Sequence, residues 1–167
     1  MILRQPSMVQ MGPIIFLDFG GVLRRNIPDY YRLGDGYFDP ECVAVLNELV
    51  RISLAKVCIV SDERRNHTLE SLRHLFQKER VYAEIVGMTS TDIDELDLPD
   101  GNYLDRGVEI DDWISRNKPT SFVIIDDNND MRDELCKKLV QTIPENGLTE
   151  EDIQLALIIL SAGLLVD

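Results

Sequence analysis

Residues 14–23 read IIFLDFGGVL, an apolar run that ends on a single carboxylate, Asp18, and is followed by a pair of glycines. A short run of this composition is typical of a strand that is buried on both faces of a sheet. Gly20 and Gly21 predict that the chain turns sharply after the strand, with positive φ. The first strand is therefore expected to end on an acidic side chain beside a tight turn.

Four more short apolar runs follow along the chain, and helical patterns separate most of them. With the first run, the predicted strands are Ile14–Asp18, Val57–Val60, Glu84–Val86, Phe122–Asp126 and Leu139–Thr142. Strands that are almost continuously apolar and connected by helices favour a parallel sheet covered on both faces. We therefore predict an α/β fold, a Rossmann-like three-layer sandwich with a mostly parallel five-stranded sheet.

Capping residues and apolar spacing predict four helices. They are expected to begin at Pro40 behind the cap residue Asp39, after Asn66, at the cap residue Asp105, and at Thr149, where Asp152 completes a capping box. Residues 89–103 are acidic and without periodicity, which predicts an exposed loop.

The length of 167 residues and the apolar content of 44% suit one domain over residues 1–167. Residues 1–12 are expected to be a flexible or loosely docked N-terminal segment. Thirty acidic residues face 17 basic ones, a formal charge of −13, which opposes non-specific binding to nucleic acid or to anionic lipid. A local basic patch such as Arg64 and Arg65 can still bind phosphate.

The three cysteines, Cys42, Cys58 and Cys136, are far apart and form no C-x-x-C pair. This spacing argues against a disulfide framework and against a zinc site, and it favours a reducing compartment. The N-terminal segment lacks the long apolar core of a signal peptide or a membrane span. We therefore expect a cytoplasmic protein that does not associate with membranes.

Polar side chains stand at the ends of three predicted strands: Asp18, then Ser61 and Asp62, then Asp126 and Asp127. The carboxyl ends of parallel strands meet at one edge of a sheet, where ligands bind in such folds. Clustered carboxylates repel one another unless a hard cation lies among them, and such oxygen ligands suit Mg²⁺. The sequence therefore predicts a Mg²⁺-assisted phosphate site.

Four ordered stretches, FLDFGGVL, VCIVSDERR, DRGVEIDDWI and FVIIDDNND, resemble the motifs of the haloacid dehalogenase (HAD) phosphotransferase superfamily. With the tail LVQTIPENGLTEEDIQLALIIL, the chain is more narrowly similar to the HAD-like domain of Swiss Army Knife RNA repair proteins. The resemblance covers the chain from Ile14 onward. It implies a Mg²⁺-dependent phosphatase or phosphotransferase, and the short connections imply that no large cap covers the site.

By this resemblance Asp18 is the nucleophile that takes the phosphoryl group as an aspartyl-phosphate. Ser61 is implied to hydrogen-bond a phosphate oxygen, helped by the amide end of the following helix. Arg106 matches the position of a Lys or Arg that steadies the nucleophile and neutralises phosphate charge, and Lys118 is the alternative. The catalytic residues expected are therefore Asp18, Ser61 and Arg106.

The resemblance also implies a metal site and a substrate surface. Asp126 and Asp127 are implied to hold Mg²⁺ together with Asp18 and the backbone carbonyl of Gly20. The residues expected to contact the substrate are Gly20, Gly21, Asp62 and Arg65. Arg65 is assigned from a family stretch whose Trp this chain lacks, since it reads SDERR.

Gly20 is the main departure from the superfamily pattern. Most phosphatases of the superfamily carry a second Asp there, which protonates the leaving group and then activates water. Glycine performs neither step, although its carbonyl can still bind the metal. General acid–base help is typically worth about 10²- to 10⁴-fold, so phosphoryl transfer is expected to be impaired rather than abolished.

Two other classes of protein share features with this sequence. A binding or regulatory protein that kept the fold but lost turnover with the second Asp is the main alternative. A two-component receiver domain is disfavoured because its acidic pair follows the first strand, and G-x-G-x-x-G and P-loop motifs do not occur. The substrate is expected to be phosphorylated, with a nucleic-acid end, a phosphoprotein and a small molecule all possible.

Overall fold

The structure is a computed structural model that describes residues 10–28, 36–91 and 106–163. Several predictions fall outside these ranges. They concern most of the expected N-terminal segment, the cap residue Asp105 and residues 92–103 of the expected loop. Of the N-terminal segment, Met11 is described and is docked on the fold. Its side chain packs against one of the two hydrophobic clusters, and its carbonyl accepts a hydrogen bond of 2.9 Å from the amide of Thr120.

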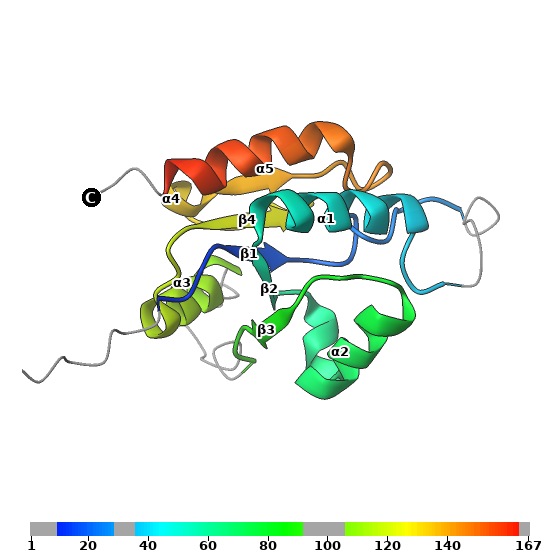
Figure 1. Ribbon diagram of the computed structural model, residues 1–167, viewed down its shortest axis with the longest axis horizontal. Helices are drawn as coiled ribbons and strands as arrows, with labels where there is room; N and C mark the ends of the chain where they lie inside the picture. The colour runs from blue at the N-terminus through cyan, green and yellow to red at the C-terminus, as the bar shows by residue number, and fades with distance from the viewer. Residues whose placement is uncertain (1–9, 29–35, 92–105, 164–167) are drawn as a thin grey trace, which may run out of the picture.

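The predicted sheet is confirmed, with all five strands parallel and in the order β3-β2-β1-β4-β5 (Figure 1). The strands are β1 (Ile14–Leu17), β2 (Lys56–Ile59), β3 (Ile85–Met88), β4 (Phe122–Asp126) and β5 (Leu139–Gln141). Their ends differ from the predicted ones by no more than two residues. The strand that comes first in the sequence thus lies at the centre of the sheet.

The four predicted helices are present, and two shorter elements accompany them. They are α1 (Pro40–Ser53), the 3-10 segment η2 (Asp62–Asn66), α2 (Leu69–Lys78), α3 (Arg106–Asn117), α4 (Asp133–Cys136) and α5 (Glu150–Ala162). The expected capping box is formed, because Thr149 and Asp152 exchange hydrogen bonds at the start of α5. No described helix has the length and apolar character that crossing a membrane requires.

Two hydrophobic clusters make the molecule a three-layer sandwich. Ile15 and Leu17 pack with residues of α1, α2 and α5, whereas Ile14 and Phe16 pack with residues of α3 and α4. Successive side chains of a strand point to opposite faces, so an uninterrupted apolar run serves both clusters. All four of these side chains are fully buried. The three cysteines are free thiols, as their spacing predicts.

The glycine pair after β1 differs from the expectation at one of its two positions. Gly21 has a φ of 65°, and a Cβ there would lie 2.5 Å from Oδ2 of Asp127. Gly20 does not have positive φ, and a Cβ there would meet nothing closer than Oδ2 of Asp18 at 3.9 Å. The prediction of positive φ is therefore confirmed at Gly21 and wrong at Gly20. The backbone requires glycine only at Gly21.

Candidate active site

Three aspartates gather at the carboxyl edge of the sheet. Asp18 follows β1, Asp126 ends β4, and Asp127 is the next residue along the chain. Leu17 of β1 pairs with Ile125 of β4, so the register brings Asp18 and Asp126 to the same level. One carboxylate oxygen from each of the three aspartates lies within 4.8 Å of the others. The structure thus brings together the carboxylates that the sequence places at strand ends.

These carboxylates line a cleft of about 520 Å³. Of the residues expected at the site, the cleft is lined by Asp18, Gly20, Gly21, Ser61, Asp62, Arg106, Asp126 and Asp127. Arg24, Arg25, Asn26, Glu63, Asn128 and Pro144 complete its walls. A larger hollow of about 790 Å³ lies between α1 and α5, but it contains none of the expected site residues. The chemistry-bearing groups therefore share one depression at the sheet edge.

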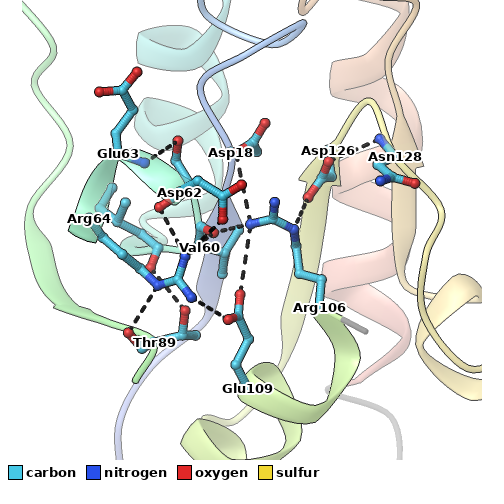
Figure 2. A network of polar contacts seen from close by, with 12 residues as sticks. Asp18, Val60, Asp62, Glu63, Arg64, Thr89, Arg106, Glu109, Asp126 and Asn128 are labelled. Carbon is cyan, nitrogen blue, oxygen red and sulfur yellow. Dashed lines mark hydrogen bonds and ion pairs between the residues drawn. The ribbon is translucent and has the colours of Figure 1, made fainter. Parts of the chain in front are cut away.

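Arg106, the first described residue of α3, places its guanidinium among the carboxylates (Figure 2). Its Nε lies 3.0 Å from Oδ2 of Asp126, and its Nη1 lies 3.9 Å from Oδ1 of Asp18. Nη1 also donates a hydrogen bond to the carbonyl of Val60. The guanidinium therefore lies where it can compensate charge at Asp18.

Lys118, the alternative to Arg106, lies beyond the opposite end of α3. Lys118 comes twelve positions after Arg106, and the helix between them rises about 18 Å at 1.5 Å per residue. Lys118 does not line the cleft. The geometry therefore favours Arg106 for the role of neutralising phosphate charge.

Burial dominates the titration of the two inner aspartates. It raises the pKa of Asp18, against the opposing effects of the Arg106 guanidinium and of hydrogen bonds from the Phe19 amide and the Ser61 hydroxyl. Burial also raises the pKa of Asp126 to about 7, although Arg106 and the amide of Asn128 act in the opposite direction. The two carboxyls share one guanidinium, and a bound cation would favour the ionised form of both.

The donor set fits a hard divalent cation. Oδ2 of Asp126 is buried and accepts no hydrogen bond from the described residues. The nearby Nε of Arg106 contacts it as an ion pair but is not aligned as a hydrogen-bond donor. A buried carboxylate oxygen that accepts no hydrogen bond normally has another partner, such as a bound ion or an ordered water molecule. With oxygen atoms of Asp18 and Asp127 close by, the site offers the carboxylate ligands that Mg²⁺ prefers.

Ser61 and Asp62 follow β2 and form the wall of the cleft opposite β4. Ser61 is buried and caps η2, because its hydroxyl accepts a hydrogen bond of 3.4 Å from the amide of Glu63. The same hydroxyl contacts Asp18. Asp62 is exposed at the rim. The element that directly follows Ser61 is the five-residue 3-10 segment η2, and the helix expected after Asn66 follows it as α2.

Arg65 lies apart from the other expected site residues. Its side chain is about half exposed, its Nε is 4.0 Å from Oδ1 of Asp62, and it lines a separate pocket rather than the cleft. The preceding residue, Arg64, is turned inward instead and is only 2% exposed. The expected contact of Arg65 with a substrate in the cleft is thus not supported by its position.

A buried ion pair behind the cleft is absent from the sequence-based prediction. Arg64 donates to the carbonyls of Val60, Ser61 and Thr89 and forms an ion pair with the buried carboxylate of Glu109. The other carboxylate oxygen of Glu109 lies 3.7 Å from Nη1 of Arg106. Figure 2 shows the two arginines on either side of Glu109. The one signal for this network is that Glu109 lies one turn after Arg106 in the expected helix.

An all-parallel sheet whose carboxyl edge gathers three aspartates, a serine and an arginine defines an α/β protein of the HAD type. The sequence matches the HAD domain of Swiss Army Knife RNA repair proteins over residues 14–153, and the chain belongs to this family. No curated protein was found to match the chain. Membership of the family indicates phosphoryl-transfer chemistry, for which HAD proteins generally use Mg²⁺.

Proposed function

We propose that the protein is a Mg²⁺-dependent phosphatase or phosphotransferase that forms an aspartyl-phosphate on Asp18. The observation that carries this proposal is the position of the Asp18 carboxylate, in the cleft and beside both Ser61 and Arg106. A phosphate that reaches Asp18 meets a nucleophile, a hydroxyl donor and a guanidinium at once. Such a preorganised set is what phosphoryl transfer requires.

Each residue has a defined task in the proposed transfer. A carboxylate oxygen of Asp18 attacks phosphorus, and the bond from phosphorus to the leaving oxygen breaks with its electron pair on that oxygen. Ser61 donates a hydrogen bond to a phosphoryl oxygen, and Arg106 balances the charge of the phosphoryl group. Asp126 and Asp127, with Asp18 and the carbonyl of Gly20, would hold Mg²⁺, which when bound neutralises charge on the phosphoryl oxygens.

The absence of a side chain at Gly20 determines which substrates react well. A departing alkoxide needs a proton, whereas a phenolate or a carboxylate departs without one. Aryl and acyl phosphates are therefore the better substrates. Water that attacks the aspartyl-phosphate also lacks a base at Gly20, so the covalent intermediate accumulates and appears as a burst of leaving group.

The size of the connections bears on the size of the substrate. Roughly 20 residues join β1 to α1 and β3 to α3, fewer than the about 40 that a separate folded domain needs. A cap domain therefore has no room in either connection, and the cleft can admit a bulky molecule. Together with the RNA repair context of the family, this favours the phosphorylated end of a polynucleotide as the substrate.

The proposal is tested with an aryl phosphate such as p-nitrophenyl phosphate. Phosphate release is expected in Mg²⁺, is expected to stop with EDTA, and is expected to be absent in Asp18→Asn. Phosphate release that persists in folded Asp18→Asn would contradict the covalent mechanism. No release by the wild type, combined with retained binding of a phosphate mimic, would favour a binding or regulatory protein that lost turnover with the second Asp.

Binding of Mg²⁺ is expected to depend on pH through Asp126. Without metal this carboxyl has a pKa of about 7, so below pH 7 it is mostly protonated and must lose its proton to bind a cation. Affinity should therefore rise with pH, approaching tenfold per unit below pH 7, and level off above it. Calorimetry between pH 5.5 and 8 measures both the affinity and the released proton. An affinity that is independent of pH, or unchanged in Asp126→Asn, would contradict the assignment.

Arg106→Ala is expected to weaken binding of a phosphate mimic such as vanadate by tenfold or more, roughly the effect of losing one charge-assisted hydrogen bond. Lys118→Ala is the matched control, because Lys118 lies at the far end of the same helix, outside the cleft. It should leave the affinity within about twofold of the wild type. The opposite result for the two variants would reassign the role to Lys118.

A further inference from the structure

A second pocket, of about 580 Å³, lies between η2, the end of β3 and α3. We name it the arginine pocket, after Arg64, Arg65 and Arg116, which line it with His67, Ser90 and Thr91. None of its described lining residues is an Asp or a Glu, although the chain has 30 acidic residues and 17 basic ones. Its described lining is therefore basic, although each of the three arginines also contacts a carboxylate outside that lining.

We propose that the arginine pocket binds a second phosphate of a polynucleotide whose terminal phosphate lies at Asp18. This inference rests on the proposed function, because it extends the same substrate beyond the cleft. A polynucleotide carries a phosphate on every nucleotide, so its end presents one phosphate to the cleft and another to a neighbouring pocket. A protein phosphorylated at one residue has no such second group.

The two sites are neighbours, separated by a single buried ion pair. Arg64 lines the arginine pocket and pairs with Glu109, and Glu109 lies 3.7 Å from Nη1 of Arg106, which lines the cleft. Segment η2 also serves both sites. Its first residues line the cleft, and its later residues, Arg64 and Arg65, line the arginine pocket. A strand that leaves the cleft over η2 therefore passes the arginine pocket.

The two outer arginines are partly exposed, and so are the carboxylates with which they form ion pairs. Arg116 forms an exposed ion pair with Asp112 one turn earlier on α3, and the Nε of Arg65 is 4.0 Å from Asp62. Exposed ion pairs of this kind contribute about 0–1 kcal/mol. A guanidinium binds phosphate through two parallel hydrogen bonds, which is a stronger arrangement. The hydroxyls of Ser90 and Thr91 add further polar groups to the same pocket.

The overall charge of −13 does not prevent this binding. At physiological ionic strength, charges separated by more than about 8 Å are largely screened from one another. A phosphate inside the arginine pocket therefore responds mainly to the side chains that line it. The remaining negative surface disfavours long stretches of nucleic acid, so the expected ligand is a short single-stranded end.

The test measures binding of a 5′-phosphorylated tri-uridylate, labelled at its 3′ end, by fluorescence anisotropy in EDTA. The double variant Arg65→Gln/Arg116→Gln is expected to bind it about tenfold more weakly. The slope of log affinity against log salt should also fall by about 0.7 for each phosphate that an arginine no longer binds. Arg51→Gln is the matched control, since Arg51 is also exposed, has an ion-pair partner one turn away, and lies on α1. It should change neither quantity.

Three results would overturn the inference. The first is that the wild type does not bind the trinucleotide, and the second is that Arg51→Gln loses as much affinity as the double variant. The third is that the double variant loses as much affinity for a singly phosphorylated peptide as for the trinucleotide. Uridine 5′-monophosphate, which carries one phosphate, supplies the reference affinity, and the ratio of trinucleotide to mononucleotide affinity should fall in the double variant. This readout requires no turnover. Arginine-dependent binding without phosphate release would uphold the pocket and reject the enzyme, whereas release without such binding would do the reverse.

Discussion

Gly20→Asp is expected to raise the turnover of alkyl phosphates by roughly 10²- to 10⁴-fold, the range for general acid–base catalysis. The backbone accepts the change, because Gly20 lacks positive φ and its Cβ would have 3.9 Å to the nearest atom, Oδ2 of Asp18. The new carboxyl would enter a cluster that already contains Asp18, Asp126 and Asp127. Like charges raise its pKa, which suits an acid that must hold a proton before it gives the proton to the leaving group.

Steady-state kinetics on alkyl and aryl phosphates measure this effect, with circular dichroism to check the fold. Gly20→Asn is the matched control, because it has the same shape as Gly20→Asp but no transferable proton, and it should give no gain. Gly21→Asp should fail to rescue, since φ is positive there and Asp127 occupies the space. A wild type that cleaves alkyl and aryl phosphates equally well would mean that another group already supplies the proton.

Glu109→Ala is expected to destabilise the protein by about 3–5 kcal/mol, the usual effect of removing one member of a buried ion pair. The side chain of Arg64 is 1% exposed and would lose its buried carboxylate while keeping a contact of 3.4 Å with the exposed Asp62. Arg106 loses a nearby carboxylate at the same time. For a chain of this length each kcal/mol lowers Tm by about 2–4 °C. Thermal or urea unfolding of the metal-free protein measures the change.

The matched control for Glu109→Ala is Asp112→Ala, one turn further along α3. Asp112 also pairs with an arginine, Arg116, but this pair is exposed, and its removal should change stability by less than about 1 kcal/mol. Replacing both members of the buried pair, with Arg64→Met and Glu109→Met, should recover much of the loss because no unpaired charge remains. Equal losses in Glu109→Ala and Asp112→Ala would show that burial has no part in the effect.

The strands could be predicted from the sequence because most of them are short apolar runs, and three of these runs are followed by polar residues at the sheet edge. Ile14–Leu17 needs burial on both faces, and a parallel sheet between two layers of helices is the arrangement that provides it. The same reasoning places Asp18 and Asp126 at one edge, since parallel strands end together. The fold and the carboxylate cluster therefore follow from local patterns.

The contacts that depend on long-range packing could not be predicted in this way. Arg64 and Arg65 are adjacent and chemically identical in the sequence, yet the side chain of Arg64 is buried and that of Arg65 is about half exposed. Their difference arises from the 3-10 segment η2, which turns the Arg64 side chain toward Glu109 on a helix 45 residues away. Likewise, the different φ values of Gly20 and Gly21 depend on the path of the turn and not on the residue type.

The central place of β1 in the sheet has a consequence for how the protein folds. Leu17 pairs with Ile125, so forming the contact between β1 and β4 closes a loop of roughly 100 residues, which is slow and entropically unfavourable. Asp18 at the end of β1 and the carboxylates at the end of β4 meet only when that loop has closed. A chain released before β4 is made would therefore carry an intact first motif but not the assembled cluster of three aspartates. A cation that binds the assembled aspartates would in turn draw the folding equilibrium toward the closed sheet.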